Sequence, residues 1–279
     1  ASGSGRNIAI GSSAFRNGES DTPDDNTAYE NVIIGYNAMA GNLGVDAEHC
    51  TANQNVLIGV KAGYNNLSGN HNVGIGDEAL YDLTTGDDNI AVGYNSLNIT
   101  TGSKNTVIGN YAGNALTTEE NQTFIGHKAG QHTTGASQAL HIGYYAGLYL
   151  QGGDHNVILG GLAMGSGNTS DYSQNSGEKN VAIGYKAIGG GIGTTDNLTA
   201  QYNVAMGYES MRLATSAQYN ISIGANSGWD MTTGSYNVLI GVNSGQNITT
   251  GQDLFALGVN SLLSAVEDKK HIGIGTESL

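Results

Sequence analysis

Three pairs of adjacent carboxylates have the residue types that catalysis could use: Asp24 and Asp25, Asp87 and Asp88, and Glu119 and Glu120. Glycoside hydrolysis needs two carboxyl groups about 5–10 Å apart, one to donate a proton and one to attack or to activate water. Each pair lies in a predicted turn or insertion, where solvated acidic residues are common without any catalytic role. We therefore predict no catalytic residue and no enzyme, and keep a polysaccharide-degrading enzyme as the alternative.

Metal binding is the second chemistry that the residue types allow. The seven histidines are scattered without the short spacing of zinc ligands, and His141 and His271 sit at repeat positions typical of packing or interface residues. Asp-rich turns offer the oxygen ligands that Ca²⁺ prefers, although they lack the Gly/Asp pattern of calcium-binding β-rolls. We assign no metal site and no cofactor, with Ca²⁺ as the one ion that these turns leave open.

One short repeat must position all of these residues. The pattern Asn-Val-x-Ile-Gly-x-x-(Ala/Ser) recurs fifteen times, and its glycines are Gly11, Gly35, Gly59, Gly76, Gly93, Gly109, Gly126, Gly143, Gly160, Gly184, Gly207, Gly224, Gly241, Gly258 and Gly275. Most are 17 residues apart, and four intervals carry six or seven extra residues. Self-similarity at a short fixed period is the signature of a solenoid.

Each repeat combines a strand, a corner and a turn. Apolar residues alternate before the glycine, as in a strand, and the glycine then forms a tight corner with positive φ. Ala or Ser always follows three residues later, and a turn such as Thr84–Gly86 usually closes the unit. A unit this short buries its apolar side chains only by stacking on its neighbours. We predict an all-β parallel β-solenoid, of β-roll or β-helix type, with fifteen coils in a single domain over residues 1–279.

An asparagine precedes eleven of the fifteen predicted strands, beginning with Asn7. In stacked coils these side chains would lie at one corner and form an amide ladder, each bonding the coil above and the coil below. The remaining members of this predicted structural ladder are Asn31, Asn55, Asn72, Asn89, Asn105, Asn156, Asn180, Asn203, Asn220 and Asn237.

The central position of each strand indicates self-association. We expect the apolar residues on either side of it, such as Val32 and Ile34, to point into the coil, and the central residue to point outward. In most units the central residue is nevertheless small or apolar, as at Ile33 and Leu57. A strand that is apolar on both faces is covered on both faces, and an identical chain is the simplest cover. We predict a homo-oligomer and prefer a homotrimer, although this pattern alone leaves dimer and trimer open.

Four insertions interrupt the regular spacing, near residues 16–30, 40–54, 165–179 and 189–202. They fall as two adjacent pairs, so neighbouring coils would project neighbouring loops from one side. Variable loops on a rigid scaffold often carry recognition. The candidate ligand-binding residues, of types that suit sugar binding, are Tyr29, His49, Asp171, Tyr172 and Tyr202. The alternative is that these loops only fill the surface or a groove of the oligomer.

The charge balance disfavours several partners. With 24 acidic and 10 basic residues the formal net charge is −14, which argues against nucleic acid and anionic membranes. No stretch approaches the roughly 18 apolar residues of a membrane span, so no membrane insertion is predicted. An acidic, polar repeat chain fits an extracellular location, on a virion or on a cell surface.

Two segments carry a resemblance to known repeats, residues 89–102 (NIAVGYNSLNITTG) and residues 180–188 (NVAIGYKAI). They resemble the repeats of phage-type tail fibres most closely, and also the head domains of trimeric autotransporter adhesins, whose repeat is shorter. The resemblance implies a homotrimeric fibre or head. We therefore predict a non-enzymatic fibre or adhesin segment that binds a host-surface glycan or protein receptor and acts as a spacer on a phage tail or a bacterial cell surface. The alternatives are a tailspike-like polysaccharide-degrading enzyme and a purely structural filament subunit.

Overall fold

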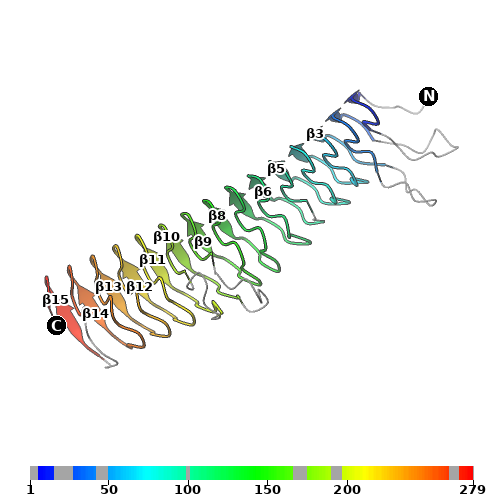
Figure 1. Ribbon diagram of the computed structural model, residues 1–279. Helices are drawn as coiled ribbons and strands as arrows, with labels where there is room; N and C mark the ends of the chain where they lie inside the picture. The colour runs from blue at the N-terminus through cyan, green and yellow to red at the C-terminus, as the bar shows by residue number, and fades with distance from the viewer. Residues whose placement is uncertain are drawn as a thin grey trace. The chain divides into compact units, whose positions relative to one another are not determined.

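The computed structural model describes residues 6–15, 28–41, 50–98, 101–165, 175–189, 197–263 and 270–278. The chain folds into two compact units, residues 1–131 and 132–279, and each is a series of short parallel strands joined by turns (Figure 1). The first unit contains β1 (Ile8–Ile10), β2 (Val32–Ile34), β3 (Val56–Ile58), β4 (Val73–Ile75), β5 (Ile90–Val92), β6 (Thr106–Ile108) and β7 (Thr123–Ile125). The second contains β8 (Leu140–Ile142), β9 (Val157–Leu159), β10 (Val181–Ile183), β11 (Val204–Met206), β12 (Ile221–Ile223), β13 (Val238–Ile240), β14 (Phe255–Leu257) and β15 (Ile272–Ile274).

Successive strands within each unit pair in parallel, with equivalent repeat positions side by side. In the second unit Val204 pairs with Ile221, and Ala205 pairs with Ser222. The longer intervals that follow β1, β2, β9 and β10 leave this register unchanged. The all-β parallel solenoid with a repeat of about 17 residues is therefore confirmed, and the insertions leave the sheet without altering it.

The glycine after each strand forms the corner of the coil. Gly207 has a φ of +145°, and a Cβ atom added there would lie 2.4 Å from the carbonyl oxygen of Gly224 in the next coil. Both the positive φ and the close stacking of the two backbones require glycine. The predicted positive-φ corner is confirmed.

Three further positions in most coils have left-handed backbone, and at two of them the residue is not glycine. Lys61 and His71, for example, have φ values of +52° and +57°. The Lys61 N–H donates to the Tyr36 carbonyl oxygen at 2.8 Å, and the His71 N–H donates to the Asn53 carbonyl oxygen at 3.1 Å. Since a left-handed conformation costs an L-residue about 1–2 kcal/mol, these hydrogen bonds between coils must offset that cost repeatedly.

The central residue of each strand points into the coil, so the predicted assignment of the two strand faces was wrong. Ile33 and Leu57 are fully buried, whereas Val32 and Ile34 on either side of Ile33 are only half-buried. A three-residue strand places one side chain on one face and two on the other, and the narrow coil has room for one. The face that meets solvent therefore carries two apolar residues per strand, except in β6 and β7, where the first residue is Thr106 or Thr123.

Complementary volumes on the two walls fill the interior of the coils. Gly63 lies against Leu57, and a Cβ atom added at Gly63 would be 2.6 Å from the Leu57 Cδ1 atom. Where the strand residue is small, as at Gly74, the opposite wall carries the fully buried Leu80. Close packing of this kind explains why glycine and larger apolar residues alternate at the position of Gly63 and Leu80.

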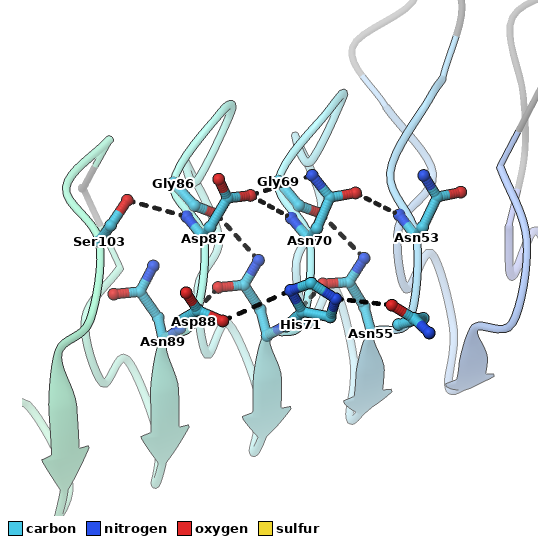
Figure 2. Close-up of polar contacts among 12 residues, drawn as sticks. Asn53, Asn55, Gly69, Asn70, His71, Gly86, Asp87, Asp88, Asn89 and Ser103 are labelled. Atoms are coloured by element: carbon cyan, nitrogen blue, oxygen red, sulfur yellow. Dashed lines mark hydrogen bonds and ion pairs between the residues drawn. The ribbon is translucent and has the colours of Figure 1, made fainter.

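Buried asparagines before the strands form an amide ladder in each unit. In the second unit, Asn220 Nδ2 donates to Asn203 Oδ1 at 2.9 Å and to the Gly234 carbonyl oxygen at 2.8 Å. Asn220 Oδ1 accepts from the N–H and Nδ2 of Asn237, both at 3.0 Å. The same row is visible in the first unit (Figure 2). Each of these amides therefore joins consecutive coils, and burial strengthens its hydrogen bonds.

Candidate functional site

The first and third residues of the strands form two outward rows in each unit, which we call the outer strand face. In the second unit the two rows comprise Leu140, Val157, Val181, Val204, Ile221, Val238, Phe255 and Ile272, and Ile142, Leu159, Ile183, Met206, Ile223, Ile240, Leu257 and Ile274. None of these side chains is charged, and the exposed fraction is 39% at Ile221 and 41% at Leu257 and is higher still in β15. A regular apolar surface is therefore exposed to solvent along the second unit.

Tyrosines lie beside the outer strand face, directly after the corner glycines. Tyr36 and Tyr94 occupy this position in the first unit, and Tyr144, Tyr185 and Tyr208 occupy it in the second; all five are exposed. The rings of Tyr185 and Tyr208 stack with their centroids 5.7 Å apart. Interfaces between proteins are enriched in aromatic residues, and their centres are depleted of charge. The outer strand face and its tyrosines have that composition.

A row of polar side chains in the first unit accepts hydrogen bonds from the backbone of the preceding coil (Figure 2). The N–H of Asn53 donates to Asn70 Oδ1 at 2.9 Å, and the N–H of Asn70 donates to Asp87 Oδ1 at 2.7 Å. The N–H of Asp87 then donates to Ser103 Oγ at 3.0 Å. Backbone donation runs toward the higher-numbered coil, opposite to its direction in the buried asparagine ladder. Asp87 is thereby a structural acceptor between coils.

A second polar row in the first unit runs through His71 (Figure 2). Its Nε2 atom lies 2.6 Å from Gln54 Oε1, and its Nδ1 atom lies 3.4 Å from Asp88 Oδ1. Gln54 Nε2 donates to Glu30 Oε2 at 3.0 Å, and Glu30 also pairs with Arg6. This row is a solvated network at the surface. It adds little to stability, because exposed ion pairs contribute only about 0–1 kcal/mol. Asp88 therefore lies in a different row from its neighbour Asp87.

The other carboxylate pairs give no arrangement of two converging acids in the described part of the chain. Glu119 Oε2 accepts the N–H of Thr118 at 2.9 Å and so caps its own turn. Asp24 and Asp25 lie outside the described residues. Among the residues that the structure describes, no group of three or more His, Cys, Asp and Glu side chains is arranged to hold a metal ion.

Three tyrosines in the second unit form a continuous stack, which we call the tyrosine row: Tyr202, Tyr219 and Tyr236. Their ring centroids are 4.8 and 5.1 Å apart, and the planes deviate by 7° and 3°. Lys179 Nζ lies 5.0 Å from the Tyr202 ring centroid and 3.1 Å from its hydroxyl oxygen. The rings are 40%, 44% and 59% exposed in chain order. Because stacking covers the facing ring surfaces, the row presents mainly ring edges and hydroxyl groups to solvent.

Two of the five candidate ligand-binding residues lie within the described residues. Tyr29 is exposed, and its N–H donates to Asn53 Oδ1 at 2.8 Å. Tyr202 belongs to the tyrosine row and sits at a corner of the coil, directly before the buried Asn203. The other three candidates, together with most of the four insertions, lie outside the described residues: His49, Asp171 and Tyr172.

Sequence reasoning missed two members of the tyrosine row, Tyr219 and Tyr236. Their signal is the spacing of 17 residues between successive members of the row, in the recurring triplets Gln-Tyr-Asn and Ser-Tyr-Asn. Equivalent positions of a solenoid stack directly, so a side chain that recurs at the repeat period forms a row.

His141 is a packing residue of the second unit. The ring is fully buried, and a Cβ atom added at Gly147 would lie 2.4 Å from its Nδ1 atom. Burial lowers the pKa of His141 from 6.5 to about 3, because the charged imidazolium would lose its hydration. The side chain is therefore neutral at physiological pH.

Comparisons with known proteins give no relative from which a role could be transferred. No protein-family model, no curated protein and no solved structure matches the chain. Within the described segments there is also no helix with the length and hydropathy to cross a bilayer. The functional argument therefore rests on the surfaces described above.

Proposed function

We propose that the chain is a non-enzymatic segment of a homo-oligomeric fibre or adhesin, with a homotrimer as the assembly. The observation that carries this proposal is the outer strand face, where each unit exposes two uncharged rows that are apolar except at Thr106 and Thr123. Monomeric soluble proteins rarely expose contiguous apolar patches larger than a few hundred Å². A surface of regularly repeated apolar residues is instead typical of one that another chain covers.

A second copy of the chain fits this face better than an unlike partner does. Each chain carries a formal charge of −14, so two copies repel wherever their acidic surfaces meet. The outer strand face carries no charged side chain in the described residues, which favours it as the surface of contact. Identical coils also have the same spacing of about 4.8 Å, so apolar rows of two copies match along their length.

The recognition part of the proposal concerns the surfaces outside the outer strand face. Regular coils supply a rigid scaffold, and the polar rows, the tyrosine row and the insertions vary along it. Rigid scaffolds with variable surface groups commonly carry binding sites. We assign to these surfaces the binding of a host-surface glycan or protein receptor, and to the coils the role of a spacer on a phage tail or a bacterial cell surface.

Charged substitutions on the outer strand face test the proposal. Met206→Glu and Ile221→Lys each place a charge at a side chain that is more than a third exposed, so the isolated chain should tolerate them. In an oligomer the same charges would be buried without a partner and should shift sedimentation from trimer toward monomer. Thr250→Lys, at an exposed turn, is the matched control and should leave the assembly intact. Equal sedimentation of all three variants and the wild type would contradict the proposed interface.

A further inference from the structure

The tyrosine row has a polar row directly beside it. Gln201 and Gln218 precede Tyr202 and Tyr219 in the chain, and the backbones of Gln201 and Gln218 pair as a parallel bridge. Both glutamine side chains are partly exposed. Two consecutive coils therefore each present one phenol and one carboxamide. Equivalent groups are one coil apart, and the ring centroids of the two tyrosines are 4.8 Å apart.

Between the two ends of the row, the groups available to a ligand are hydroxyls and amides, not ring faces. Each ring in the tyrosine row covers the face of its neighbour, and Lys179 lies over Tyr202 at the start of the row. A sugar stacked flat on a ring would have to separate these pairs. A ligand that runs along the row instead meets a line of phenol hydroxyls and a line of amides. Both kinds of group can donate and accept hydrogen bonds.

We propose that the tyrosine row, together with Gln201 and Gln218, binds an extended neutral polysaccharide whose pyranose units are joined by equatorial linkages, with one sugar unit per coil. This inference rests on the recognition role proposed above. A pyranose unit in such a chain advances by about one coil step, roughly 5 Å. Successive sugars in such a chain are turned by a half-turn about the chain axis, so successive tyrosine hydroxyls meet hydroxyl groups from alternating edges of the sugars. Those groups still lie in a straight line at the coil spacing, which a helical chain of axially linked sugars does not achieve.

The charges on and around the tyrosine row favour a neutral sugar chain. The tyrosine and glutamine side chains are uncharged at physiological pH, and the chain as a whole is acidic, so an anionic polysaccharide would be repelled. Lys179, the cation at the start of the row, is already paired with Glu178 at 3.3 Å.

The test uses the full chain and four defined probes. Insoluble cellulose and chitin are used in sedimentation binding assays, and cellohexaose and chitohexaose in calorimetry. At least one of these β-1,4-linked probe types should bind, whereas amylose and dextran should not. A triple variant, Tyr202→Phe with Tyr219→Phe and Tyr236→Phe, keeps the ring stack but removes the three hydroxyls, and should weaken binding at least tenfold. The matched control replaces the stacked pair Tyr64 and Tyr81 by phenylalanine and should bind as the wild type does.

Three binding results would overturn the polysaccharide site: no binding to any of the four probes, equal binding to amylose, or undiminished binding by the triple variant. Sedimentation velocity on the same samples separates these failures from failure of the fibre proposal. An oligomer that binds none of the probes leaves the oligomeric fibre in place and removes only the polysaccharide site. Dissociation of the oligomer in the triple variant would assign the tyrosine row to the contact between copies and would also overturn the site.

Discussion

Asn220→Ala is the substitution that best probes how the coils hold together. The side chain of Asn220 is 1% exposed and takes part in four hydrogen bonds, to Asn203, Gly234 and Asn237. Alanine removes all four hydrogen bonds. Its backbone preferences leave the local backbone conformation otherwise unchanged. Asn203 Oδ1 still accepts from the backbone N–H of residue 220, and Asn237 Nδ2 still donates to the carbonyl oxygen of Gly251.

The cost follows from the groups that lose their partners. The buried N–H of Asn237 loses its acceptor, whereas the carbonyl oxygen of Gly234 loses the Asn220 amide donor but still accepts the N–H of Gln218 at 3.3 Å. An unsatisfied buried polar group costs about 1–3 kcal/mol, and the loss of a hydrogen bond at a group that keeps another partner costs about 0.5–1.5 kcal/mol, so the substitution should destabilise the surrounding coils by roughly 1.5–4.5 kcal/mol. Asn247→Ala, at an exposed position one and a half coils further on, should cost less than about 0.5 kcal/mol.

Native-state hydrogen exchange measures this difference where it arises. Because stability in a repeat protein is a sum of local and nearest-neighbour contributions, peptides covering β11 to β13 should lose protection in Asn220→Ala, and peptides from β3 to β5 should not. Urea unfolding of the same two variants supplies the total free energy. A difference below about 0.5 kcal/mol between Asn220→Ala and Asn247→Ala would refute the reasoning that the buried amide ladder joins the coils.

The corner, the pH response and the core give further predictions. Gly207→Val should lower the melting temperature, because valine resists a φ of +145° and its Cβ would lie 2.4 Å from the Gly224 carbonyl oxygen; unchanged melting would refute this corner geometry. Stability should fall as the pH drops from 6.5 toward 3, because the unfolded chain protonates His141 while the folded chain keeps it neutral, a difference of about 5 kcal/mol once both pKa values are passed. Urea titrations of His141→Leu should show a shallower pH dependence than the wild type, and equal slopes would mean that the folded His141 titrates normally. Phe124→Ala should cost about 3–5 kcal/mol by urea unfolding, since the ring is fully buried, and Phe124→Leu should cost less; equal losses would argue against close packing around this ring.

The coil boundaries could be predicted because the corner glycine is determined by local backbone geometry. A positive φ and the close stacking of one backbone on the next exclude other residues, so the glycine recurs with the period of the fold. The buried asparagines recur for a similar reason, since a ladder needs an amide in consecutive coils. Both features depend on one residue position and are visible in a single sequence.

The buried face of the strands could not be predicted from alternation, because both faces carry apolar residues. The deciding signal lies in pairs of positions six residues apart: Leu57 with Gly63, and Gly74 with Leu80. Side chains that compensate each other in volume share one interior, so the central strand residue must point inward. This compensation in volume between two positions is not visible when each position is considered separately.

The tyrosine row shows why the candidate site was only partly predicted. Tyr202 was selected because it ends an insertion, but its neighbours in space are Tyr219 and Tyr236, one and two repeats later. A row of this kind is defined by the repeat period and not by irregular segments. Surface composition at equivalent positions is therefore the better guide to sites on a solenoid.

The mass of the assembly in solution tests the central claim most directly. Multi-angle light scattering of the full chain at micromolar concentration should give three times the chain mass of 28.7 kDa, about 86 kDa, because the outer strand face is proposed to be covered by identical copies. The same measurement on Ile221→Lys should move the mass toward that of one chain, since the substitution charges the proposed contact. A wild-type mass of 28.7 kDa under these conditions would contradict the account.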